Sequence, residues 1–184
     1  MLPQEFYTRP TLTVASDLLG KVIVCNNVGV LITEVEAYLP DDSACHAYRG
    51  KTKRNAPMFE AGGILYVYLC YGIFNLFNVV TGKKGVPSAI LIRAGIPYEN
   101  TPEIVKRRKG KTDLIGPGKV GQALAANREM SGTSVVTPNC HIKAGPIPKF
   151  IQRVPRIGID YAQPVDRDAP LRFIAYDFFE EPGE

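Results

Sequence analysis

Three side chains in "LITEVEAYL", residues 31–39, could do chemistry together. If this stretch is a strand, alternation places Glu34, Glu36 and Tyr38 on one face. Neighbouring carboxylates repel each other unless a site uses them or water screens them, so a solvated strand face is the alternative interpretation. Tyr38, however, extends the face as an aromatic surface, and His46 follows in a loop that can fold back towards it. A carboxylate, an aromatic ring and an imidazole can together hold a planar ligand and activate a water molecule.

Arg93 is a charged residue at the end of a strongly apolar stretch, "SAILIRAG" (88–95), which we expect to be a buried strand ending at this arginine. A buried arginine needs an anionic partner. It either forms a structural ion pair or lies beside Glu36, where it would keep the carboxylate ionised and orient its water. The residues alone leave both interpretations open.

Tyrosines dominate "ILYVYLCYGIF" (64–74), which reads as a strand followed at once by a second strand, "NLFNVV". Alternation puts Tyr66 and Tyr68 on one face, where core or cross-strand packing is the usual role of such residues. Tyr71-Gly72 falls where the chain must reverse, because glycine readily adopts the positive φ that tight turns need. A large aromatic side chain at a hairpin tip has little to pack against, so Tyr71 calls for another explanation.

The remaining pattern describes the elements that must position these residues. We expect one domain over residues 1–184, with a mixed α+β, β-dominated fold: a curved, largely antiparallel sheet or open barrel with flanking helices and a protruding hairpin. The expected elements are a helix at 11–19, a hairpin at 21–38, an irregular loop at 39–59, the tyrosine hairpin, a short helix or basic loop at 102–111, a helix at 116–129, a turn-rich stretch at 137–149 and closing strands at 150–159 and 170–179.

Composition indicates a soluble protein with a slight basic excess, since the net charge is +4 and no apolar run is long enough to span a bilayer. The first residues lack the apolar core of a signal peptide, so a cytoplasmic location is expected. Cys25, Cys45, Cys70 and Cys140 lie far apart with no CxxC pair, which favours reduced thiols over a disulfide or a zinc site. The basic runs at 51–54, 82–84 and 106–111 are either solvated faces or a phosphate-binding rim.

Several motifs occurring in order closely resemble the alkyladenine (3-methyladenine) DNA glycosylases. They are "ITEVEAYLPDDSACHAYRGKTKRNAPMF", "GILYVYLCYGIFNLFN", "AILIRAG", "GPGKVGQAL" and "PRIGI…PLRF", and together they cover almost the whole chain. The resemblance implies a monomeric, single-domain enzyme whose hairpin enters the DNA minor groove, with Tyr71 filling the gap left by a damaged nucleotide that has been rotated out.

The resemblance also implies the roles of the site residues. The flipped base would lie between Tyr38 on one side and Tyr68 with His46 on the other, with Asn78 on the pocket floor disfavouring the exocyclic amine of guanine. Glu36 matches the general base that activates the attacking water, and Arg93 matches an arginine that helps to position the site. No cofactor and no metal are implied. The expected partner is double-stranded DNA with alkylated or deaminated purines, in a bacterial cytoplasm and without a membrane.

Some positions depart from the family pattern. The chain has no tryptophan, Asn75 stands where an aromatic residue is common, and Cys45 precedes His46 where alanine or serine is expected. These differences bear on the range of lesions and on hairpin packing. Glu34 shares the face of Glu36 but falls outside the matched catalytic position, so we expect its replacement to have a much smaller effect.

Two other functions fit parts of the sequence. One is a non-catalytic nucleic-acid-binding module related to the C-terminal domain of methionyl-tRNA formyltransferase, although a pure binder would not need a carboxylate facing its ligand. The other is a carbohydrate glycosidase using Glu34 and Glu36, whose Cβ atoms would lie about 6.5 Å apart on one strand. Two side chains pointing the same way from one strand could not flank a glycosidic bond.

Overall fold

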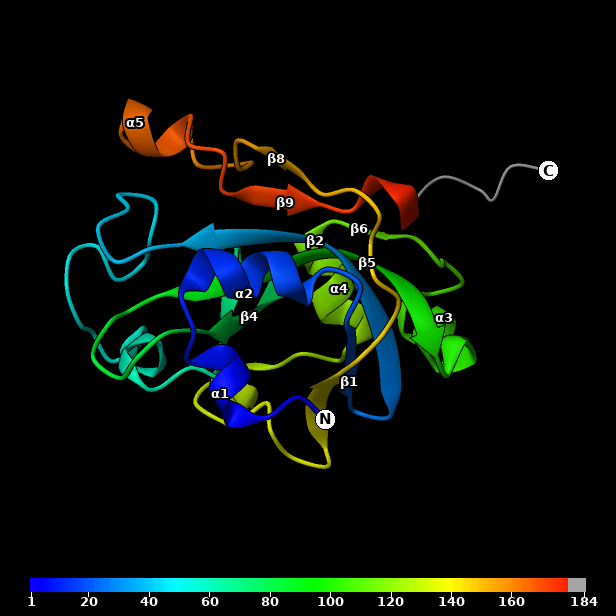
Figure 1. The fold of residues 1–184 in the computed structure, drawn as a ribbon. Coiled ribbons are helices and arrows are strands. Elements are labelled where there is room, and N and C mark those ends of the chain that lie inside the picture. The colour runs from blue at the N-terminus through cyan, green and yellow to red at the C-terminus, as the bar shows by residue number, and fades with distance from the viewer. Residues whose placement is uncertain (179–184) are drawn as a thin grey trace.

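The computed structural model describes residues 1–178, whose strands join in one nine-stranded, curled antiparallel sheet with helices packed on it. This confirms the expected mixed, β-dominated fold (Figure 1). The helices are α1 (Gln4–Tyr7), α2 (Thr11–Leu18), α3 (Thr101–Arg107), α4 (Pro117–Ala123) and α5 (Pro164–Arg167), with short 3-10 turns at Ala56–Phe59, Arg128–Met130 and Tyr176–Phe178. The strands are β1 (Val22–Cys25), β2 (Val28–Tyr38), β3 (Leu65–Cys70), β4 (Phe74–Val80), β5 (Ala89–Glu99), β6 (Leu114–Ile115), β7 (Cys140–Lys143), β8 (Gln152–Val154) and β9 (Arg172–Ile174).

The long strands β2 and β5 form the centre of the sheet, whose main order is β3-β4-β5-β2-β1-β7. The other edge of β2 is shared, because β1 pairs with its first half and β9 pairs with residues 34–36. Helix α2 packs against β2, and its buried side chains Val14, Ala15 and Leu18 belong to the main core. The site residues of β2 therefore sit on a strand that has neighbours on both edges and a helix on one face.

Strict alternation along β2 is wrong in its first half. Ile32 lies in the main core, and so do Val35 and Ala37, although alternation would place Ile32 on the opposite face from the other two. The reason is a β-bulge, since the pairing with β5 shifts register between Ile32 and Glu34 and again before Val35. An extra residue in one strand changes which face each later side chain occupies. The bulge keeps the apolar residues in the core and turns Glu34 and Glu36 to the other side.

Other boundaries also differ from expectation. Strand β5 continues past Arg93 to Glu99, so this arginine lies within a strand and not at its end. The stretch 137–149, expected to be turn-rich, contains β7, because β1 offers it a free edge to pair with. The closing segments form only the short strands β8 and β9 with α5 between them; residue 179 of the second expected strand lies outside the described residues.

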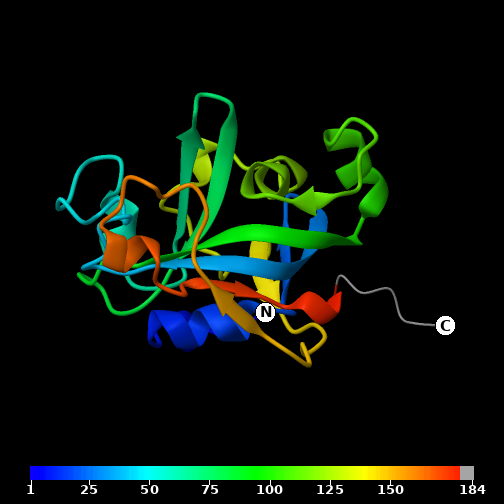
Figure 2. The same cartoon turned by 90° about the horizontal axis from the view of Figure 1, so that it is seen from above.

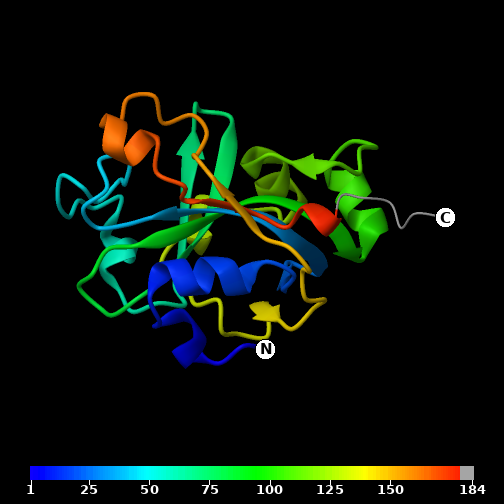
Figure 3. The same ribbon diagram turned by 45° about the horizontal axis from the view of Figure 1, so that its top comes forward.

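The tyrosine hairpin forms as expected and projects from the β2–β5 pair on the side opposite α2, as Figures 2 and 3 show. Tyr71 and Gly72 have φ values of 49° and 70°, the left-handed conformation, and with Ile73 they form the turn between the paired residues Cys70 and Phe74. Helix α4 packs against β4 so closely that a Cβ on Gly121 would come 2.0 Å from the carbonyl oxygen of Asn75. Glycine at this helical position therefore lets α4 support the base of the hairpin.

None of the helices described in residues 1–178 has the length and apolar character needed to cross a membrane.

The expectation of four reduced cysteines is wrong in this structure, because Cys25 and Cys140 form a disulfide. The two residues stand directly opposite each other where β1 pairs with β7. Their separation of 115 residues explains why no spacing pattern in the sequence indicated the bond. Cys45 and Cys70 are free thiols.

Thiol counting tests this disulfide. We expect the unfolded, unreduced protein to react with two equivalents of an alkylating reagent, at Cys45 and Cys70, and the reduced protein to react with four. Because the bond closes a long loop, reduction should lower the free energy of unfolding by about 3–5 kcal/mol. The Cys25→Ser/Cys140→Ser protein is the control and should be insensitive to reductant. Four reactive thiols without reduction would show that the bond does not form.

Candidate active site

A cavity of about 380 Å³ opens where the hairpin meets β2 and β5. Two loops complete its wall: one after β2, which carries Ala44 and His46, and one after β8, which carries Ile157 and Tyr161. The structure brings all of the site residues named from the sequence to this one cavity. They are Glu36, Tyr38, His46, Tyr68, Tyr71, Asn78 and Arg93.

Glu36 is fully buried, and its carboxylate has three polar partners. The hydroxyl of Tyr38 donates to Oε2 at 3.0 Å, the backbone N–H of Ile157 donates to Oε1 at 2.9 Å, and Arg93 Nη1 lies 3.4 Å from Oε1. Burial raises the pKa of Glu36, while Arg93 and the two donors act in the opposite direction. The expected effect of Arg93 is therefore present, but desolvation outweighs it. A carboxylate with a raised pKa is a stronger base towards water than an ordinary surface glutamate.

Arg93 contacts both glutamates. It therefore forms an ion pair with Glu34 and also lies beside Glu36, so the two interpretations do not exclude each other. Its Nε lies 3.0 Å from Oε1 of Glu34, and the same Glu34 oxygen lies 3.0 Å from Nη1 of Arg172. Arg172 stands opposite Glu36 in the pairing of β9 with β2. Glu34 thus joins two arginines and fixes the one that reaches Glu36. Replacement of Glu34 would disturb Arg93, so a Glu34 variant is not a suitable control for a Glu36 variant.

The aromatic wall consists of His46 with Tyr66 and Tyr68. The His46 ring meets Tyr68 edge-on at a centroid distance of 4.6 Å, and its Nδ1 is 2.9 Å from the hydroxyl of Tyr66. Burial lowers the pKa of His46 to about 4, and the charge of Arg54 contributes in the same direction. The imidazole is therefore neutral at physiological pH and presents no charge to a cationic ligand.

Asn78 forms a buried part of the cavity floor. Its amide nitrogen donates to the backbone carbonyls of Tyr66, at 3.0 Å, and Leu76, at 3.3 Å. The side chain therefore cannot swing aside without losing these two hydrogen bonds. Such a fixed floor can discriminate between bases by size.

The hairpin tip is the exposed rim of the cavity. Tyr71 is 90% exposed and still lines the cavity, and the neighbouring Ile73 is 70% exposed. Tyr71 has no core role, which agrees with the expectation that a tip aromatic packs against little. An exposed apolar pair on a projecting hairpin has the shape of a wedge.

The basic runs differ from one another. Lys51, Lys53 and Arg54 are exposed beside the cavity loop, and Lys83 is exposed near the base of the hairpin. In the third run, Arg107 donates to the carbonyls of Ala123 and Asn26, and Arg108 is buried against Gln122. These two arginines are structural, so the third run cannot serve entirely as a phosphate-binding surface.

Sequence analysis did not identify Asp42 and Arg156, which support the cavity residue Tyr38. A buried ion pair joins Arg156 to Asp42, and Arg156 also covers one face of Tyr38. Arg156 lies in "PRIGI", a motif that carried the resemblance, but only the fold places it behind a cavity tyrosine. Within residues 1–178, no group of three or more His, Cys, Asp or Glu side chains could hold a metal ion.

Comparison with known proteins gives a consistent result. The family model of methylpurine-DNA glycosylase matches residues 5–178. A protein of Arabidopsis thaliana named DNA-3-methyladenine glycosylase is 44% identical over 96% of this chain and 72% of its own length. Two further proteins, both provisionally named 3-methyladenine DNA glycosylases, are each 45% identical to this chain. The protein of Chlamydia abortus matches over 96% of this chain and 98% of its own length. The protein of Methanocella arvoryzae matches over 94% of this chain and 91% of its own length. The chain therefore belongs to the methylpurine-DNA glycosylase family.

Proposed function

We propose that this protein is a monofunctional DNA glycosylase that rotates damaged purines out of duplex DNA and hydrolyses their N-glycosidic bond with a water activated by Glu36. Family membership makes the chain a DNA glycosylase, a hydrolase of DNA repair. The observation that carries the proposed mechanism is the buried carboxylate of Glu36, which faces an aromatic cavity beside an exposed tyrosine tip. The substrate classes are 3-methyladenine, 7-methylguanine and hypoxanthine, with ethenoadenine as a further candidate.

Base recognition follows from the cavity walls. A flipped purine enters between Tyr38 and the pair formed by His46 and Tyr68, and rests above Asn78. Tyrosine faces attract electron-poor rings, so alkylated purines, which carry positive charge, stack well there. The neutral His46 does not oppose that charge. Tyr71 occupies the gap in the duplex and offsets part of the unstacking cost, which is a few kcal/mol.

The chemical step uses few groups. Glu36 accepts a proton from water as the water oxygen attacks C1′, and the bond from C1′ to the base nitrogen breaks with its electron pair going to the base, leaving an abasic site. A cationic alkylated base thereby leaves neutral, whereas hypoxanthine takes up a proton from solvent water as it leaves. The sugar passes through an oxocarbenium-like state, which the nearby carboxylate stabilises electrostatically. Arg93, held by Glu34, keeps the carboxylate in place. Among the residues that the structure describes, those lining the cavity include no lysine, so the wall offers no side-chain amine for the Schiff base of a strand-cleaving glycosylase.

The competing functions have less support. Glu34 does not line the cavity and is bound by two arginines, so it cannot act as the second carboxylate of a carbohydrate glycosidase. A pure nucleic-acid-binding module would have no use for a desolvated carboxylate in its ligand cavity, since burial of that charge is costly.

The decisive substitution is Glu36→Gln, which keeps the shape and removes the charge. Release of hypoxanthine from duplex DNA should fall by about 10²–10⁴-fold or more, because both the base and the electrostatic stabilisation are lost. The unfolding midpoint at pH 7 should not fall, because burial already disfavours the charged carboxylate. Glu99→Gln, on the same sheet but in a surface ion pair with Lys143, is the matched control and should retain activity. Full hypoxanthine release by Glu36→Gln would overturn the carboxylate mechanism.

Tyr71→Ala tests the wedge. Affinity for duplexes with an abasic site or a lesion, measured by fluorescence anisotropy, should fall clearly, because the gap in the stack is no longer filled. Stability should change by less than about 1 kcal/mol, because the side chain is 90% exposed. Tyr98→Ala, at a half-exposed position outside the cavity, controls for loss of a surface tyrosine. Unchanged lesion affinity in Tyr71→Ala would remove the wedge from the proposal.

The pH dependence of stability tests the neutral state of His46. The pKa is about 4 in the folded protein and 6.5 ordinarily, so the unfolded chain takes up the proton first as pH falls. His46 should therefore stabilise the fold above about pH 6.5 and lose that contribution between pH 6.5 and 4, on the order of 2 kcal/mol. Urea unfolding of the parent protein and of His46→Gln at pH 7 and pH 4.5 isolates this contribution. An equal loss in both proteins would show that His46 is not buried in its neutral form.

A further inference from the structure

Arg156 lies directly behind the base-stacking tyrosine. Its guanidinium carbon is 4.7 Å from the centroid of the Tyr38 ring, and its side chain is fully buried and does not line the cavity. Tyr38, in contrast, does line the cavity. The guanidinium therefore covers the face of Tyr38 turned away from the cavity.

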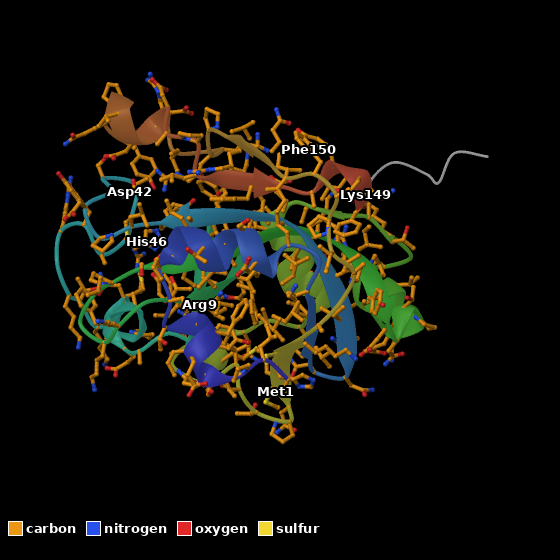
Figure 4. The ribbon with its side chains drawn as sticks, viewed as in Figure 1. Met1, Arg9, Asp42, His46, Lys149 and Phe150 are labelled. Atoms are coloured by element: carbon orange, nitrogen blue, oxygen red, sulfur yellow. A yellow bond between two sulfur atoms is a disulfide. The ribbon has the colours of Figure 1, made fainter. Side chains whose placement is uncertain are left out.

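The guanidinium is held from several elements. Its Nη2 donates to Asp42 Oδ1 at 3.0 Å and to the carbonyl of Asp166 at 3.0 Å, and its Nη1 binds the other oxygen of Asp42 and the carbonyl of Ala37, the latter at 3.0 Å. Asp42 belongs to the loop that leads to His46, and Figure 4 shows both residues on this loop, beside the segment that carries α5. The stacked position is thus built into the fold and does not depend on a flexible surface arginine.

A cation behind an aromatic ring alters what the other face can bind. The guanidinium attracts the π-electrons of Tyr38 towards itself, which makes the cavity face less negative and less attractive to a second cation. Asp42 compensates the buried charge, which it must do for the ion pair to be tolerated. The strength of the pull on Tyr38 therefore depends on both members of the pair.

We propose that the Arg156–Asp42 pair is a specificity determinant of the cavity, which weakens the preference of Tyr38 for cationic bases and so lets neutral damaged purines compete. This inference rests on the proposed function and deepens it, because it concerns which lesions the same cavity accepts. Arg156 acts through Tyr38 and is a positioning residue. It also precedes Ile157, whose N–H donates to Glu36, so a purely structural role would affect every substrate alike.

The test is a ratio of rates. The value of kcat/KM is measured for base release from duplexes with 7-methylguanine, which is cationic, and with hypoxanthine, which is neutral. Dividing the first by the second, and then by the wild-type ratio, cancels the intrinsic difference between the leaving groups. General damage to the fold lowers both rates and leaves this ratio unchanged.

A double variant and a single variant should move the ratio in opposite directions. The double variant Asp42→Asn/Arg156→Gln removes both charges and should raise the ratio by at least about threefold, because Tyr38 regains its electron density. Asp42→Asn alone leaves the cation uncompensated and should lower the ratio. Arg156→Lys keeps the charge and should restore a ratio near that of the wild type. Arg153→Gln is the matched control, since Arg153 stacks on Phe173 at 4.8 Å outside the cavity, and should leave the ratio unchanged.

The outcomes separate the two claims. Wild-type protein that releases neither base overturns the proposed function itself. An active wild type whose ratio stays unmoved in both Asp42→Asn and the double variant overturns only the role of the pair. If the double variant fails to fold, as judged by its thermal unfolding, Asp42→Asn alone decides: a lowered ratio supports the inference, and an unchanged or raised ratio overturns it.

Discussion

The arrangement of this protein depends on one chain of charges, which runs from the half-buried Arg172 through the buried Glu34 and the half-buried Arg93 to the buried Glu36. A carboxylate removed from water is costly unless cations and hydrogen-bond donors surround it. Here Glu36 gains the Arg93 guanidinium, the Tyr38 hydroxyl and a backbone N–H, and yet burial still raises its pKa. The surrounding residues therefore stabilise the carboxylate only in part, and Glu36 keeps a raised pKa, which suits a group that must accept a proton.

The sheet provides the rigidity that such a balance requires. Glu34 and Glu36 lie on β2, Arg93 on β5 and Arg172 on β9, and β2 is hydrogen-bonded to both of the other strands. The aromatic walls come from more varied places, since Tyr68 and Asn78 lie on the hairpin while His46 lies in a loop. The pair of Asp42 and Arg156 joins that loop to the segment after β8, so the loop is anchored from inside the protein as well as by its ends.

Much of the local structure could be predicted from the sequence. The hairpin at Tyr71-Gly72 and the turn at Asn26-Asn27 follow from short-range turn preferences, and the residues at both turns have positive φ. The predictions failed where a partner distant in sequence determines the result. The stretch around Cys140 becomes a strand because β1 offers an edge, the disulfide joins residues 115 positions apart, and the face of Ile32 depends on a bulge set by pairing with β5.

By itself, the sequence determined the family and the identity of the cavity side chains, because ordered motifs such as "EVEAYL", "HAYRG" and "LYVYLCYG" are specific enough to indicate both. Only the tertiary structure decided how those side chains are supported. The partners of Arg93, the neutral state of His46 and the guanidinium behind Tyr38 all depend on burial and on contacts between distant segments. Alternation and propensity act over a few residues, whereas desolvation and ion pairing act through space, and a single sequence carries no direct record of which segments meet.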